Sequence, residues 1–200
     1  YGVGPRSSHV DKVGMVAAVG YAFAVVDGLK PAVGAAPYDV LARQLPRLLV
    51  MRLNGAADRG VRFFPFLGMV DGTRSFLRLH TCFQPKQLIK LHKQGDARLL
   101  CDGILREGVL HWRVVDGESA RVLLEIDLPF DPSSPTEVLT RLEFELMELL
   151  GWSGRPQPAS VLDGESLGWF LILRDVLLRR EAGLVDDGAD PLLSARKGLE

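Results

Sequence analysis

The stretch from Leu99 to Phe130, LLCDGILREGVLHWRVVDGESARVLLEIDLPF, constrains the fold more than any other part of the chain. It contains three apolar segments of strand length, Arg98–Leu105, Val109–Val115 and Ala120–Leu128. The short connections between them, REG and DGES, carry the Gly, Asp and Ser residues that are typical of hairpin turns. We therefore expect an antiparallel β-meander of three strands.

The alternation of residue types along these strands predicts one covered face and one wet face. In the middle strand Leu110, Trp112 and Val114 fall on one face, and His111 and Arg113 fall on the other. In the third strand the same pattern places four apolar residues opposite the acidic ones: Val122, Leu124, Ile126 and Leu128 against Glu125 and Asp127. This pattern is typical of a sheet that helices cover on one side. We expect Trp112 to pack between the sheet and a helix.

Three further strands are expected before the meander, at Val13–Val26, Val61–Leu67 and Ser75–His80. The first is apolar on both faces, which indicates a buried position. The longer apolar run Val13–Leu29 has about the length of a membrane span, but Gly14, Gly20, Asp27 and Gly28 dilute it. A buried strand is therefore favoured, and no membrane span is expected.

Four helices and a short fifth one are expected. The first runs from Tyr38 to Leu53, and Pro46 should kink or split it. The second runs from Pro85 to Gly95. The third begins with a capping box, Ser134 to Glu137, and ends at Gly151, with Arg141, Glu143, Glu145 and Glu148 facing water. The fourth covers Glu165–Glu181 and stops at Gly183, and Asp190-Pro191 starts the short one.

Residues with chemical potential are few and carry no recognised catalytic signature. The two cysteines, Cys82 and Cys101, have no CxxC or metal spacing, so we expect both to be free and at least one to be buried. Together with His80 and His92 they are the only plausible nucleophile or metal set, and a core role for the strand cysteine is the simpler interpretation. Phosphate-binding glycine loops are absent. No cofactor and no metal are expected.

The acidic residues of the meander leave one alternative open. Paired carboxylates can carry out glycoside hydrolysis, and Asp116, Glu118, Glu125 and Asp127 lie close in the sequence. Their alternation fits a wet sheet face equally well. An enzyme of unknown class that uses Cys and His or paired carboxylates is therefore the second hypothesis. The net charge of −1 argues against nucleic-acid binding.

The order of these segments resembles a known family. With LARQLPRLL, then VRFFPF, then the meander, then EVLTRLEFELMELLGW, residues 13–152 resemble the TolB amino-terminal-like domains, to which FlgO-like and CsgG-like domains are related. Gly103 stands at the family's strand glycine and Asp116–Gly117 at its hairpin turn, whereas the first strand departs from the family's usual pattern. The resemblance implies an α/β fold with a mixed sheet, a C-terminal β-meander covered by helices, and a C-terminal helical appendage.

The resemblance also implies a function and a domain division. It suggests a non-enzymatic protein-interaction or sensory module from a larger bacterial protein. Residues 153–200 would form a linker and a helical hairpin, or the start of an array of tetratricopeptide-type repeats, although the spacing of Trp169, Leu173 and Leu177 does not match a full repeat. The cellular compartment stays open, with the cytoplasm favoured, because a chain that starts at Tyr1 would hide an upstream targeting segment.

The helix at Glu165–Glu181 carries the candidate binding site. Its apolar residues spread around most of its circumference, whereas docking on one surface needs only about a third of a helix. The excess predicts a second contact, with following helices, with a protein partner or with a second copy. The candidate partner-binding residues are Trp169, Phe170, Leu173, Arg174, Leu177 and Arg180.

Overall fold

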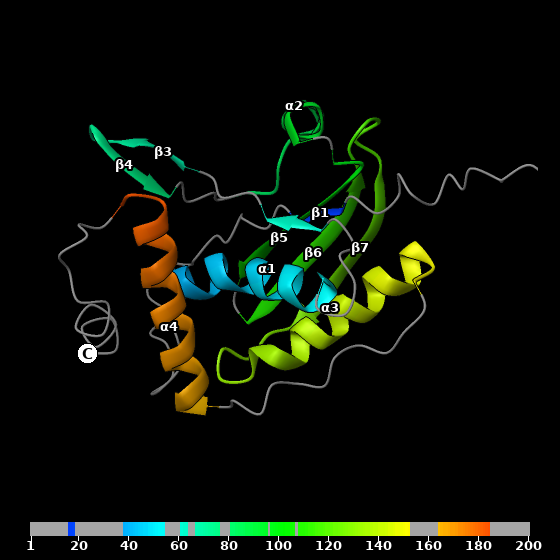
Figure 1. Ribbon diagram of the computed structural model, residues 1–200. Helices are drawn as coiled ribbons and strands as arrows, with labels where there is room; N and C mark the ends of the chain where they lie inside the picture. Colours follow the sequence, from blue (N-terminus) through cyan, green and yellow to red (C-terminus); the bar gives the residue numbers. More distant parts are fainter. Residues whose placement is uncertain are drawn as a thin grey trace, which may run out of the picture.

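The structure is a computed structural model that describes residues 16–18, 38–54, 61–63, 67–76, 81–95, 97–106, 108–152 and 164–184 (Figure 1). Seven strands and four helices are defined in these ranges. The strands are β1 (Val16–Ala18), β2 (Arg62–Phe63), β3 (Leu67–Val70), β4 (Thr73–Phe76), β5 (Leu99–Arg106), β6 (Val109–Asp116) and β7 (Val122–Pro129). The helices are α1 (Tyr38–Asn54), α2 (Pro85–Gly95), α3 (Pro135–Leu150) and α4 (Gly164–Glu181).

Five of the strands form one mixed sheet in the order β2-β1-β5-β6-β7. The short strand β1 pairs in parallel with both β2 and β5, and the remaining pairs are antiparallel. The hairpin β3–β4 forms a separate small sheet beside α4 (Figure 1). The expected fold class is confirmed: an α/β fold with a C-terminal meander, helices over the sheet and a C-terminal helix.

The predicted meander is confirmed, with one error in the third strand. Trp112 pairs with Ile126, and Val114 pairs with Leu124, so these side chains share a face as expected. A β-bulge between Val114 and Val115 then changes the register, and Val122 pairs with Val115. Because a bulge inserts one extra residue, it reverses the alternation beyond it. Val122 therefore leaves the face of Leu124 and is 41% exposed.

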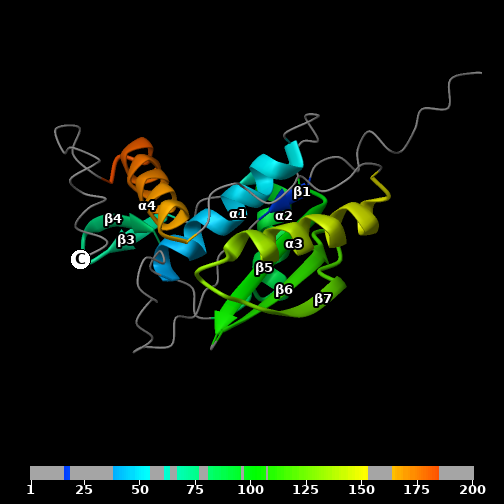
Figure 2. The same cartoon turned by 90° about the horizontal axis from the view of Figure 1, so that it is seen from below.

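One face of the sheet carries the main core. Helices α1 and α3 lie across this face, as Figures 1 and 2 show, and the side chains between them and the sheet are buried. Trp112 is 4% exposed and lies among Leu110 and Val114, as predicted. Gly103 pairs with Trp112, and a Cβ at residue 103 would lie 2.9 Å from the His111 carbonyl oxygen. The glycine therefore allows the close packing of β5 against β6 beneath the indole.

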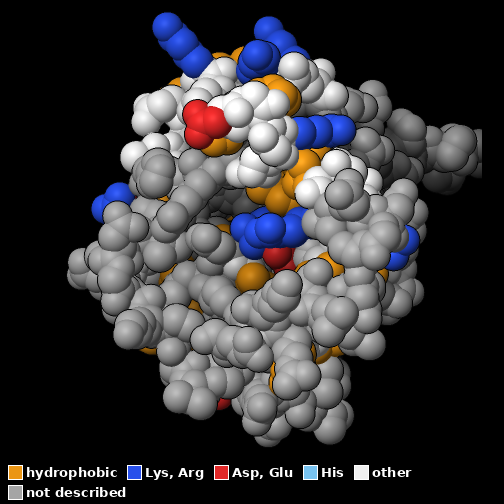
Figure 3. Space-filling view, turned by 90° about the vertical axis from the view of Figure 1, so that its left-hand side faces the viewer, with side chains coloured by type: hydrophobic (Ala, Val, Ile, Leu, Met, Phe, Trp, Pro, Cys, Tyr) orange, Lys and Arg blue, Asp and Glu red, His pale blue; other side chains and the backbone are white. Residues whose placement is uncertain are grey.

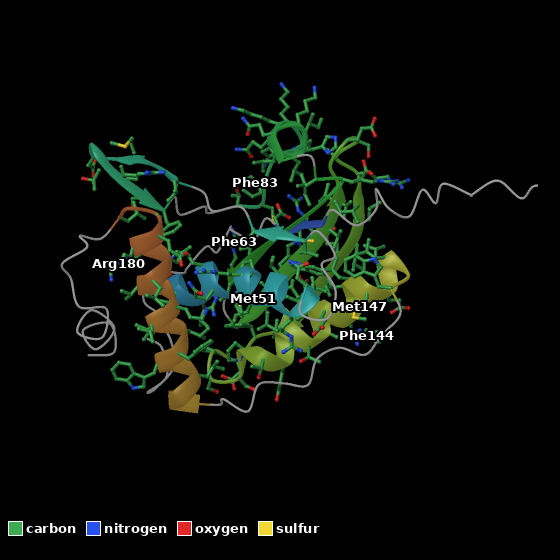
Figure 4. The ribbon with its side chains drawn as sticks, in the orientation of Figure 1. Met51, Phe63, Phe83, Phe144, Met147 and Arg180 are labelled. Atoms are coloured by element: carbon green, nitrogen blue, oxygen red, sulfur yellow. The ribbon has the colours of Figure 1, made fainter. Side chains whose placement is uncertain are left out.

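The other face of the sheet is not simply wet, because α2 covers one end of it. A second cluster of apolar side chains lies there, formed by Phe83, Leu88, Leu91, Ala97, Leu100 and Val115 (Figure 4 labels Phe83). The approach of α2 depends on Gly117, since a Cβ there would lie 2.8 Å from the Cβ of His92. The second face is therefore uncovered, as expected, only in the part that α2 does not reach, where its side chains are polar.

Two expectations about the helices are wrong, and a third, that Pro46 would kink or split α1, is wrong as to the split. Pro46 lies inside α1 without dividing it, because tertiary packing of the buried Leu45 and Leu49 supplies stability that the missing hydrogen bond does not. Ser134 makes no side-chain capping bond; its carbonyl oxygen accepts the N–H of Glu137 instead. Glu143 does not face water but is buried against α1.

The predicted ends of the described helices are confirmed, whereas Glu145, expected to face water, is only 14% exposed. The helix α2 covers the expected range, and α3 ends at Gly151 with a φ of 63°. The helix α4 covers one residue more than expected, and Gly183 follows it with a φ of 68°. Both glycines adopt the left-handed conformation in which residues with a Cβ are disfavoured. Residues 13–15, 19–26, 64–66 and 77–80 of the expected strands, which include Pro65 and His80, lie outside the described residues, as does the short helix at Asp190.

Replacing Trp112 by alanine should lower the free energy of unfolding by about 3–5 kcal/mol, because a large buried ring is lost and a cavity is left. Val109→Ala in the same strand is the control, since Val109 is an exposed residue and should change stability by less than about 1 kcal/mol. Urea denaturation followed by fluorescence and circular dichroism measures both. Equal midpoints for the two variants would contradict the assignment of the covered face.

Candidate partner-binding surface

The helix α4 packs on α1 through one apolar stripe. Leu167, Leu171, Ile172 and Leu178 are buried, and the first three belong to the main core. Figure 1 shows α4 crossing the amino-terminal part of α1, at the end of the molecule away from β7. The helix that carries the candidate site is therefore held by a helix and not directly by the sheet.

A buried carboxylate fixes the contact between the two helices. Asp175 is 3% exposed, and the guanidinium of Arg43 donates to both of its oxygens, from Nε to Oδ1 at 2.7 Å and from Nη2 to Oδ2 at 2.8 Å. Arg179, one turn further along α4, donates to Oδ2 at 3.1 Å, and the amide nitrogen of Gln44 lies 3.4 Å from Oδ1. A pair with two parallel hydrogen bonds fixes both the distance and the relative orientation of the two side chains, and so of the helices that carry them.

A second buried carboxylate holds α1 on its other side. Glu143 of α3 accepts from the Nε of Arg52 at 2.9 Å, and the same guanidinium donates to the hydroxyl of Thr140 at 3.0 Å. Sequence reasoning missed both buried acids. The signal that could have indicated Asp175 is its place within the apolar run WFLILRDVLL, where a charged residue needs a partner when it is buried.

The side of α4 opposite Asp175 carries the exposed part of the candidate site. Trp169 is 36% exposed, Leu177 is 40% exposed, and Leu173 between them is partly exposed. Their spacing of four residues aligns them along the helix. We call these three residues the outer stripe. Arg180 lies on the same side, and Figure 4 shows it projecting away from α1.

The other two candidate residues lie on the flank of α4 that borders α1. Phe170 packs against the main core, and the guanidinium of Arg174 lies 5.5 Å from its ring centroid. An Nη2 of Arg174 also lies 3.0 Å from the sulfur of Met51, and Figure 4 shows Met51 on α1. The six candidate residues thus divide into an outer stripe with Arg180 and a flank with Phe170 and Arg174.

The electrostatics of this end of the molecule are dominated by arginine. Burial, followed by the charge of Arg47, lowers the pKa of Arg174 from its ordinary value. The guanidinium of Arg43 also lies 5.7 Å from the ring centroid of Phe76 in β4. Figure 3 shows Lys and Arg side chains beside acidic and hydrophobic ones on this side of the molecule. Arginine side chains and aromatic rings therefore lie together at this end of the molecule.

The two cysteines considered for nucleophilic chemistry lie in surroundings that do not favour a reactive thiolate. Both cysteines are free, as expected; Cys101 is buried in the main core, and Cys82 is partly buried on the other face. Burial, and then the carboxylate of Asp102, raise the pKa of Cys82 to about 11, which disfavours the thiolate at neutral pH. Asp102 itself accepts from Arg113 and from the N–H of Phe83. This contact attaches the segment before α2 to the sheet.

The histidines and acidic residues of the meander also have local partners. The ring nitrogens of His111 lie 3.0 Å from Glu125 Oε1 and 2.6 Å from Asp127 Oδ1. Asp116 accepts two hydrogen bonds from Ser119, which lower its pKa. The Nδ1 of His92 lies 2.8 Å from the Ala97 carbonyl oxygen. Among the described residues no group of His, Cys, Asp or Glu is arranged to hold a metal ion.

The membrane question can be answered for the helices that the structure describes. Within those ranges, none has the length and hydrophobicity that crossing a bilayer would require.

The two thiols should differ in reactivity as their surroundings do. With iodoacetamide at pH 7, Cys82 should react slowly, and its rate should rise about tenfold per pH unit towards pH 11 because only the thiolate reacts. Cys101 should react only after denaturation, since burial raises its pKa strongly and excludes the reagent. Mass spectrometry of digested protein measures both. Rapid labelling of either residue in the native protein at pH 7 would refute this interpretation.

Replacing Asp175 by asparagine should destabilise the protein by about 3 kcal/mol, because it leaves the partly buried guanidinium of Arg43 without its counter-charge. The matched control is Glu181→Gln on the same helix, whose exposed carboxylate pairs with Arg47 at 3.3 Å. That change should cost less than about 0.5 kcal/mol. Urea denaturation curves compare the two variants, and equal effects would show that Asp175 does not anchor α4.

Comparisons with known proteins give a distant likeness of fold. No family model matches the chain, and no curated protein matches it. Among solved structures, the PelC dodecamer from Paraburkholderia phytofirmans aligns with a TM-score of 0.43 and 12% identity, over 72% of this chain and 91% of that one. TolB from Acinetobacter baumannii aligns with a TM-score of 0.40 and 12% identity, over 72% of this chain and 29% of that one. Both alignments are distant similarities.

Proposed function

We propose that this chain is a non-enzymatic protein-interaction module, and that a protein partner binds the outer stripe of α4. The observation that carries the proposal is the exposure of Trp169 and Leu177 on a helix whose opposite side is anchored in the core. Single exposed apolar residues are ordinary on protein surfaces. Three that align on one helix face, one of them a tryptophan, are typical of an interaction surface.

The anchoring of α4 supports the same function. A binding surface gains affinity when its side chains are already held in place before the partner arrives. The outer stripe lies on a regular helix, and the Asp175 contacts hold that helix on α1. Residues 153–200 would then be the part that binds, and residues 13–152 the domain that supports it.

The reactive residue types provide less support for the enzyme hypothesis. Cys101 is buried in the main core, and Asp102 and Asp116 accept hydrogen bonds that hold the segment before α2 and a turn of the meander. A raised thiol pKa is the opposite of what a nucleophilic cysteine requires. We therefore place the function on α4.

A photo-crosslinking amino acid at Leu177, introduced in cells that make this protein naturally, should yield a discrete adduct with one partner. The same amino acid at Glu118, an exposed turn residue of the meander, is the positional control and should not yield that adduct. Adding Trp169→Glu should abolish the adduct at residue 177, because a buried charge opposes apolar docking.

Each variant is first compared with the wild type by thermal unfolding, so that loss of the adduct is read only from folded protein. Adducts of the same pattern at residues 177 and 118, or no adduct at 177, would contradict the proposed function.

A further inference from the structure

Arg174 is a charged residue that forms no ion pair with any of the described residues. Its contacts are the sulfur of Met51 and the ring of Phe170, and its Nε is buried without a hydrogen-bond partner in the described part of the chain. A thioether is a weak acceptor. A buried N–H of a cation that lacks an acceptor costs stability, so this arrangement favours an acceptor from outside.

The described residues around Arg174 do not supply that acceptor. Among the described residues the junction of α1 and α4 holds four arginines and two carboxylates: Arg43, Arg47, Arg174 and Arg179 against Asp175 and Glu181. Asp175 is occupied by two of these arginines. Glu181 pairs with Arg47, so its attraction to Arg174 acts from beyond ion-pair distance.

We propose that the partner of the outer stripe is an acidic, amphipathic protein segment, which covers Trp169 and Leu177 with apolar side chains and presents a carboxylate to Arg174. This inference rests on the proposed function and specifies the chemistry of the partner. Arg174 precedes Leu177 by three positions on α4 and therefore lies beside the stripe, so one segment can reach both. A guanidinium offers parallel N–H donors that match a carboxylate.

Two properties of the site favour this partner over others. An anion without apolar groups would leave the outer stripe exposed, and a doubly charged phosphate would be repelled by Glu181 more strongly than a carboxylate. A second copy of the chain would bring its own Arg174 and Arg180 to the interface. Its described acid at this end of α4, Glu181, is already paired. A separate acidic segment completes the charge balance.

The test begins with a displayed library of random twelve-residue peptides, selected on the immobilised full chain after depletion on the Leu177→Glu variant. We expect the enriched peptides to combine Asp or Glu with aromatic or branched apolar residues. The best synthetic peptide is then measured by fluorescence polarisation against the wild type and against Arg174→Met, which keeps an apolar stem and removes the charge. The affinity should fall about tenfold or more.

The matched control is Arg141→Met on α3, whose arginine pairs with Glu145 four residues away. It should leave peptide affinity within about twofold, because Arg141 lies on α3 and not on α4. Replacing the acid of the peptide by its amide should weaken binding to the wild type but not to Arg174→Met. This double-mutant cycle assigns the lost affinity to the contact between the two groups.

The possible failures can be told apart. Two results would contradict the proposed carboxylate contact and leave the interaction function intact. One is peptides that require Leu177 but contain no acidic residue. The other is peptides whose affinity does not change with Arg174→Met. The absence of any peptide that needs Leu177 would overturn both proposals. A wild-type dimer that Leu177→Glu dissociates in sedimentation would assign the surface to a second copy. Stronger peptide binding after Asp186→Asn, Asp187→Asn and Asp190→Asn together would assign it to the chain's own acidic residues. Either of these last two results overturns the separate partner.

Discussion

Two buried carboxylates on either side of α1 determine how the helices lie over the sheet. Asp175 binds Arg43 from α4, and Glu143 binds Arg52 from α3. Apolar packing drives the helices onto the sheet, but it is not directional. An arginine–carboxylate pair accepts only a narrow range of distances and orientations, so the two pairs restrict the positions of α3 and α4 relative to α1. The pair of Asp175 and Arg43 therefore also sets the orientation of the candidate surface on α4.

Local patterns predicted most of the elements. The alternation around Trp112 assigned the covered face correctly, and Gly151 and Gly183 marked the ends of their helices. What the sequence did not reveal depends on contacts between distant residues. Arg43 and Asp175 are 132 positions apart, and Arg52 and Glu143 are 91 apart. A buried acid on a helix has the same local sequence pattern as an exposed one. A bulge such as that between Val122 and Leu124 reverses the alternation without a local marker.

The apolar excess of α4 was predictable from the sequence, but the side of the helix that stays exposed was not. An apolar excess on the helix that became α4 indicated a second contact, and the structure leaves Trp169 and Leu177 exposed on the side opposite Asp175. The sequence could not separate the docked face from the free one, because apolar residues surround this helix. It therefore grouped Phe170 with Trp169, although the first supports the core and the second faces outward. The buried Asp175 marks the docked face of α4, and the side opposite to it is the exposed one.

The position of β7 at the end of the sheet has a further consequence. No described strand pairs with its outer edge, and an exposed edge is a site where proteins aggregate through added strands. This edge carries the features that oppose such pairing: a bulge near its start, the exposed charges of Glu125 and Asp127, and Pro129, which has no N–H to donate, at its end. The sheet is thereby protected against edge-to-edge association, and the candidate surface on α4 lies at the opposite end of the molecule.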